Sequence, residues 1–124
     1  MQVFRGGSHQ VDFSQGRPTF SGDAELTSIA NLDAPSADSV SVVTFAAGAR
    51  THWHEHEAGQ VLVVVRGCGV VTVAGQESVP LSEGDVVIAE AGEIHWHGAG
   101  PSSDFAHLAI SRGTTTWHGL AEGP

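Results

Sequence analysis

The sequence contains no lysine and no tyrosine, and its five cationic side chains are all arginines. Without lysine the protein cannot form a Schiff base, and without tyrosine it has no phenol for acid/base catalysis. The arginines are scattered along the chain, whereas a phosphate-binding surface needs clustered cations. With a net charge of −9, the protein is a poor partner for nucleic acid or an anionic membrane. Histidine side chains, carboxylates and a bound metal remain as candidates for catalytic groups.

The sequence also has a single cysteine, Cys68, which cannot form an internal disulfide bond. The first residues lack the basic and then apolar pattern of a secretory signal. No apolar run approaches the roughly 18 residues of a membrane-spanning helix. We therefore expect a soluble, cytoplasmic protein in a reducing environment.

Short apolar segments separated by glycine and proline predict an all-β protein with one domain over residues 1–124. Residues 1–38 are rich in turn formers and predict only edge strands, near Val3–Phe4, Thr19–Phe20 and Glu25–Asn31. Residues 39–111 repeat the strand and turn pattern, beginning with a β-branched run at 39–46, and predict the barrel itself. Residues 112–124 are expected to be a tail that packs on this chain or on a partner.

The histidines fall in a pattern typical of metal ligands. His52, His54 and His56 alternate, as do His95 and His97, so the members of each set would share one face of an extended strand. Imidazole is the commonest protein ligand for transition metals. The alternative is a solvated strand that binds metal adventitiously. His107 lies on a strand that is apolar on both faces, where a lone histidine would more often be a core residue.

The spacing of these residues resembles the two motifs of the cupin superfamily. The first motif has glycine at both ends, two histidines and an acidic residue, and the matching positions are Gly48, His54, His56, Gln60 and Gly67, with glutamine in place of glutamate. The second motif is matched by Gly84, Gly92 and His95, but Glu90 stands at its proline position and Ala99 at its asparagine position. The resemblance covers residues 39–111 and implies a jelly-roll barrel, the cupin double-stranded β-helix.

This resemblance implies that His54, His56, Gln60 and His95 bind one divalent metal inside the barrel. Four protein ligands leave open positions only on a five- or six-coordinate ion, which favours Mn(II), with Fe(II) and Ni(II) also possible, over a closed tetrahedral Zn(II) site. Neutral Gln60 leaves the ion its full positive charge and strengthens it as a Lewis acid. His52 would then lie at the rim of the cavity.

The segments Gly48–Thr51, His95–Gly98 and His107–Ile110 are similar to small bacterial cupins of the carboxymuconolactone-decarboxylase-associated group, some of which are manganese-dependent hydroxynitrile lyases. By this resemblance Thr51, His97 and His107 would lie in the cavity, with the two histidines as acid/base groups. Three hypotheses follow: a metal-dependent lyase of a small oxygenated substrate, an Fe(II)-dependent oxygenase, and a barrel that binds or senses a small ligand without catalysis.

Three further expectations concern residues outside the cavity. Trp53 and Trp96 alternate with the predicted ligands and should face away from the metal. Arg50 and Glu93 are expected to make a salt bridge or a turn contact near the barrel mouth. Apolar outward positions at Val61, Val63 and Val65 predict a homodimer, as the resemblance also implies.

Overall fold

The computed structural model describes residues 1–5, 10–13, 19–33 and 35–121. Within them every regular element is a β-strand, so the all-β prediction is confirmed. No helix in this part of the chain has the length and apolar character needed to cross a membrane. The strands are β1 (Gln10–Phe13), β2 (Phe20–Ser21), β3 (Ala24–Asn31), β4 (Ser39–Phe45), β5 (Arg50–Thr51), β6 (Trp53–His56), β7 (Gln60–Gly67), β8 (Gly69–Val73), β9 (Val79–Leu81), β10 (Val86–Ala89), β11 (His95–Ala99), β12 (Phe105–Ser111) and β13 (Thr115–Gly119).

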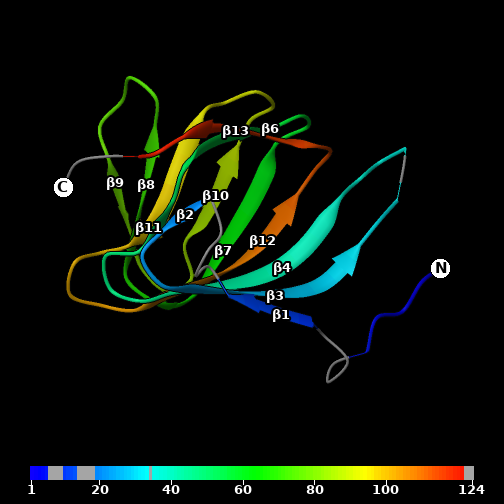
Figure 1. The fold of residues 1–124 in the computed structure, drawn as a ribbon, viewed down its shortest axis with the longest axis horizontal. Helices are drawn as coiled ribbons and strands as arrows, with labels where there is room; N and C mark the ends of the chain where they lie inside the picture. Colours follow the sequence, from blue (N-terminus) through cyan, green and yellow to red (C-terminus); the bar gives the residue numbers. More distant parts are fainter. Residues whose placement is uncertain (6–9, 14–18, 34, 122–124) are drawn as a thin grey trace.

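The strands form two antiparallel sheets that face each other (Figure 1). One sheet has the order β1-β3-β4-β12-β7-β10. The other runs β13-β6-β11-β5-β2, and β8 and β9 extend it from β11. Because side chains alternate along a strand, each sheet turns one set of residues inward and the other outward. The inward sets of both sheets build the core and the cavity.

The core occupies one end of the space between the sheets. Phe45 of β4 and Phe105 of β12 are fully buried, and their rings stack with centroids 5.9 Å apart. They pair directly across the two strands, which explains why the rings meet. Along the same strands the inward residues become smaller and more polar, ending at Ser39 and Ser111. A cavity is therefore left between the sheets beyond the aromatic pair.

The two ends of the chain differ from the sequence-based expectations. Val3–Phe4 is not a strand, and the first strand instead lies at Gln10–Phe13, where it pairs with β3. The glycine-rich turns predicted at residues 6–8 and 16–18 lie outside the described residues. The expected C-terminal tail contains β13, which pairs with β6 of the same chain. Residues 115–119 thus belong to the barrel, because they complete the edge of the sheet that carries His54 and His56.

Candidate metal and acid/base site

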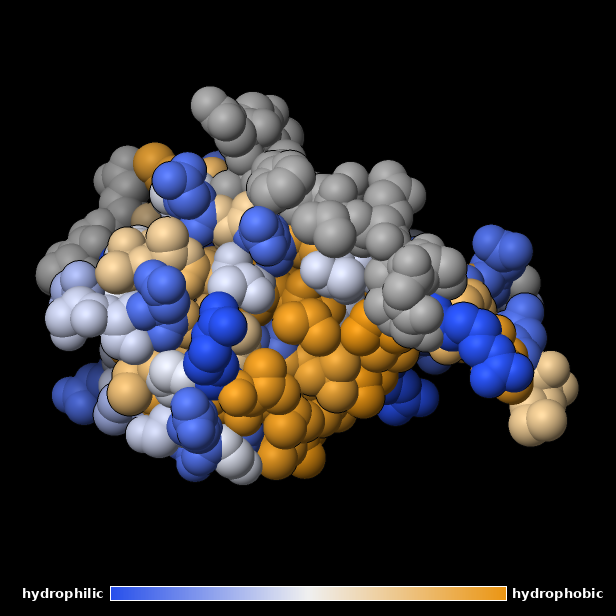
Figure 2. Space-filling model, turned by 90° about the horizontal axis from the view of Figure 1, so that it is seen from below, coloured by the Kyte–Doolittle hydropathy of each residue, from blue (hydrophilic) through white to orange (hydrophobic). Residues whose placement is uncertain are grey.

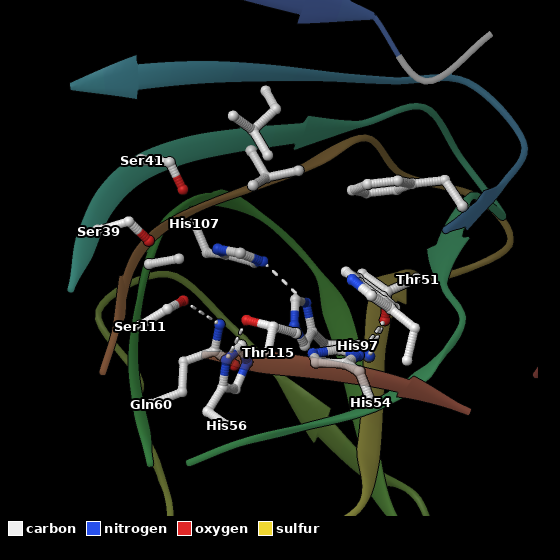
Figure 3. Close-up of a pocket in the computed structure, with 15 residues that line it drawn as sticks. Ser39, Ser41, Thr51, His54, His56, Gln60, His97, His107, Ser111 and Thr115 are labelled. Atoms are coloured by element: carbon white, nitrogen blue, oxygen red, sulfur yellow. Dashed lines mark hydrogen bonds between the residues drawn. The ribbon is translucent and has the colours of Figure 1, made fainter. Parts of the chain in front are cut away.

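Seven strands place polar side chains around a cavity of about 140 Å³ between the two sheets (Figure 3). β6 contributes His54 and His56, and β7 contributes Gln60. Among the described residues the lining is Phe20, Leu26, Ser39, Ser41, Val43, Thr51, His54, His56, Gln60, His97, His107, Ala109, Ser111, Thr115 and Trp117. His95 lies behind this wall, with its ring centroid 4.4 Å from that of His54. The structure therefore brings together every residue that the sequence assigned to the site.

The turn between β6 and β7 determines where Gln60 lies. Gly59 has a φ of 93°, a conformation that L side chains rarely adopt, and a Cβ at this position would lie 2.7 Å from the carbonyl oxygen of Ala89. Glycine removes both obstacles and lets the chain reverse within a few residues. As a result β7 begins at Gln60 with its side chain buried in the same cavity as His56.

His52 does not line the cavity, so its expected place at the rim is wrong. The alternation of the sequence is broken because β5 ends at Thr51 and β6 begins only at Trp53. The N–H of His52 donates to the carbonyl of Thr19 across this break. Thr51 and His54 consequently both face inward, each 2% exposed.

The hydrogen bonds of His54 and His95 define which ring nitrogen is free. Nδ1 of His54 lies 2.8 Å from the carbonyl oxygen of His52, and Nδ1 of His95 lies 2.8 Å from that of Glu93. A carbonyl oxygen only accepts, so both Nδ1 atoms must carry the proton. The Nε2 lone pairs then point inward, in the orientation that metal-binding histidines adopt.

Two further observations indicate that a cation fits between these groups. Nε2 of His95 lies 3.0 Å from Oε1 of Gln60, although a deprotonated Nε2 and an amide oxygen are both acceptors. In addition, no hydrogen-bonding group among the described residues reaches the buried Nε2 of His56. A divalent ion would satisfy all of these lone pairs.

A second, overlapping donor set includes His97. The ring nitrogens of His54, His95 and His97 all lie within 4.8 Å of one another, close enough to hold one ion. His97 Nε2 is also buried without a hydrogen-bond partner in the described part of the chain. The cluster can therefore hold a divalent metal either through the predicted set or through His97, and both sets contain His54 and His95.

Burial keeps these imidazole rings neutral. Desolvation, reinforced by the neighbouring His95, lowers the pKa of His54 to about 3 and that of His56 to about 4. Burial also lowers the pKa of His107 to about 4 and that of His97 well below its ordinary value. A neutral ring is the form that binds a metal or accepts a proton, so the cluster is poised for both tasks at neutral pH.

His97 and His107 form a hydrogen-bonded pair at the floor of the cavity. Nε2 of His107 lies 2.9 Å from Nδ1 of His97, and both rings pack on Phe45 with centroids 5.4 and 6.0 Å away. Thr51 Oγ1 accepts the backbone N–H of His97 and holds β11 at this point. One proton must lie between the two nitrogens, so the pair can pass a proton from one ring to the other.

The tryptophans and the charged residues near the site have structural contacts. Neither Trp53 nor Trp96 lines the cavity, in agreement with the expectation from alternation. The guanidinium of Arg50 lies 4.2 Å from the centroid of the Trp96 ring, a cation–π contact rather than the expected salt bridge. The Glu93 carboxylate accepts the backbone N–H of Glu90, which is the turn contact that was expected.

Nine residues of the cavity wall were not anticipated from the sequence, and five of them carry a hydroxyl or an indole N–H. Ser39, Ser41 and Ser111 are in phase with the inward residues Val43 and His107 of their strands, so alternation could have placed them. The other two, Thr115 and Trp117, lie on β13. Their part of the sequence carries no motif, and only the pairing of β13 with β6 brings them to the site.

Two antiparallel sheets enclosing a cluster of buried histidines define a cupin-type barrel, which confirms the predicted jelly-roll fold. Comparison with known families agrees, because residues 41–110 match the cupin domain family, Cupin_2. The chain belongs to this family.

The chain is similar to two enzymes and to a protein of known structure. The chain is 38% identical over 110 residues to an (R)-mandelonitrile lyase of Granulicella tundricola, a match that covers 89% of this chain and 83% of that protein. It is 37% identical over 67 residues to an acireductone dioxygenase of Gluconobacter oxydans, covering 52% of this chain and 36% of that protein. A cupin-like protein from Thermotoga maritima superposes with a TM-score of 0.80 at 33% identity, covering 98% of this chain and 92% of that one.

Proposed function

We propose that this cupin is a metal-dependent lyase that cleaves a small hydroxylated substrate, in the manner of a hydroxynitrile lyase. The observation that carries the proposal is the buried His97–His107 pair beside a cluster of metal-type donors in one small cavity. The similarity to an (R)-mandelonitrile lyase over most of both chains supports it.

The metal donors proposed are His54, His56, Gln60 and His95, with Mn(II) as the first choice and Fe(II), Ni(II) or Zn(II) as alternatives. Three neutral imidazoles and one neutral amide suit a five- or six-coordinate ion that keeps open positions. When bound, such an ion would act as a Lewis acid toward the hydroxyl oxygen of the substrate.

The protein's own side chains would move the proton. Neutral His107 or His97 takes the proton of the substrate hydroxyl. The C–CN bond of a cyanohydrin then breaks, and its electron pair leaves with cyanide. Finally, the His97–His107 pair returns a proton to cyanide. The products are an aldehyde and hydrogen cyanide. The hydrogen bond between the two rings allows either to accept while the other donates.

The cavity limits the substrate to a small molecule. Its volume is about 140 Å³, close to the roughly 150 Å³ of an engineered cavity that binds benzene. Phe20 and Trp117, which lie on the other sheet, offer an apolar wall opposite the serine hydroxyls of β4. A substrate of about this size, with one polar end and one apolar end, fits best.

A turnover assay distinguishes the three functional hypotheses. We expect the Mn(II)-loaded protein to release cyanide from mandelonitrile under argon at the same rate as in air, because the lyase reaction consumes no oxygen. Oxygen consumption by the Fe(II) form, with no cyanide release, would instead establish an oxygenase, the reading that the similarity to an acireductone dioxygenase favours. Ligand binding without turnover by any metal form would instead support the third hypothesis, a barrel that binds a small ligand without catalysis.

We also propose that the outward face of the six-stranded sheet joins two copies of the chain. Outward positions on β4, β7, β10 and β12 carry apolar side chains, among them Val65, Val86 and Ile88, which are 51%, 59% and 71% exposed. Figure 2 shows apolar residues gathered in one area of the surface. A mostly apolar face on a chain of net charge −9 is a surface on which a second copy meets little repulsion.

Placing a charge on this face should separate the copies. We expect Ile88→Glu to convert a dimer into a monomer in sedimentation velocity experiments, because the buried carboxylate would have no partner. The matched control is Val79→Glu, which alters a similarly exposed valine on β9 of the other sheet. A wild-type protein that sediments as a monomer, or equal effects of both variants, would refute this interface.

A further inference from the structure

The four proposed metal donors are held in two different ways. Backbone carbonyls hold the Nδ1–H groups of His54 and His95. Side-chain hydroxyls hold the other two: Thr115 Oγ1 lies 3.0 Å from Nδ1 of His56, and Ser111 Oγ accepts the amide of Gln60 at 2.9 Å. The orientation of His56 and Gln60 therefore depends on two residues outside both cupin motifs.

Strand register places each hydroxyl opposite its donor. Ser111 of β12 pairs with Gln60 of β7, and Thr115 of β13 pairs with His56 of β6. The intervening turns are joined by backbone hydrogen bonds from Glu57 to Thr114 and from Ala58 to Arg112, each 2.9 Å long. These bonds fix the β12–β13 turn against the β6–β7 turn, so the hydroxyls have little freedom to move away.

We propose that Ser111 and Thr115 are positioning residues that make Gln60 and His56 metal donors; this inference rests on the proposed metal site. In this arrangement the Thr115 hydroxyl would accept from Nδ1–H of His56 and leave the lone pair on Nε2, which is buried without a partner in the described residues. The Ser111 hydroxyl holds the amide nitrogen of Gln60 (Figure 3). As a result, Oε1 of Gln60 faces Nε2 of His95. Together they favour the four-donor set over the set that contains His97.

Metal affinity provides the first test. Chelator competition with Mn(II) alone and with Zn(II) alone should show binding weakened about 10- to 100-fold in Thr115→Val and in Ser111→Ala, the usual effect of removing a group that orients a ligand. Thr115→Ser, which keeps the hydroxyl, should restore wild-type affinity. Thr116→Val is the matched control, because Thr116 is the next residue of β13 and is exposed.

The tautomer of His56 provides a second test that does not require metal. In long-range ¹H–¹⁵N spectra of the metal-free protein, His56 should be protonated at Nδ1 in the wild type and should gain the Nε2–H form in Thr115→Val. His54 and His95 should keep their Nδ1–H form in both proteins, because backbone carbonyls hold them.

The outcomes separate this inference from the proposed function. A wild-type protein that binds neither metal would refute the proposed metal site and this inference with it. Variants that bind metal as tightly as the wild type, with an unchanged His56 tautomer, would refute only the role of Ser111 and Thr115. Weakened binding that Thr115→Ser does not restore would also count against it, because it would indicate a general loss of structure.

Discussion

Replacement of His107 by alanine is expected to lower kcat about 10²- to 10⁴-fold, the contribution that a general acid or base usually makes, while the metal stays bound. His107 is fully buried, and its Nε2 meets Nδ1 of His97 at 2.9 Å. It belongs to neither donor set, so its loss removes a proton acceptor without removing a ligand. Cyanide release from mandelonitrile and metal content by elemental analysis would be measured on the same sample.

Control variants must distinguish the loss of a proton acceptor from the loss of packing around His107. His107→Gln fills more of the space that alanine would leave and should be equally inactive, because an amide does not accept and return a proton near neutral pH. His52→Ala is the control, since His52 does not line the cavity. A metal-replete His107→Ala protein with wild-type kcat would refute the acid/base role of His107.

Removal of His54 is expected to abolish tight metal binding. His54 belongs to both donor sets, and its ring lies within 5.1 Å of the rings of His56, His95 and His97. Metal at about 100 times its Kd should stabilise the wild type by about 2.7 kcal/mol, which corresponds to a rise in Tm of several degrees for a domain of this size. His54→Ala should show no such rise in a thermal scan.

Two more variants distinguish the donor sets. If the ion is bound by His54, His56, Gln60 and His95, His56→Ala should lose most of the metal-dependent rise in Tm and His97→Ala should keep it. The reverse result would assign the metal to the set that contains His97. Far-UV circular dichroism and the Tm in chelator would show whether each metal-free variant is folded as the wild type is.

The proximity of the proposed donor residues to one another could be predicted from the sequence because part of their geometry is local. His54 and His56 alternate on β6, and the glycine turn returns the chain directly to Gln60. Their convergence with His95 needs two strands to pair, and the register indeed sets His95 opposite His54. The resemblance of the two motifs to the cupin superfamily implied this convergence.

His52 shows where local alternation fails. On an uninterrupted strand it would share the face of His54, but β5 and β6 are separate strands that pair with β11 at different points. The break depends on the hydrogen bond from His52 to Thr19, a residue more than thirty positions earlier. Alternation within one strand contains no information about such a distant partner.

By itself the sequence determined the all-β class, because this follows from alternation and turn chemistry over a few residues, and its resemblance to the two cupin motifs pointed to the histidines and glutamine proposed for a metal. Only the tertiary structure decided how those groups are oriented. It brought β13 beside β6, placed Thr115 and Ser111 against His56 and Gln60, and joined His97 to His107. The contacts of Thr115 and Ser111 join strands that are distant in the chain, and the contact of His97 with His107 joins consecutive strands of different sheets, so all of them depend on the packing of the whole barrel.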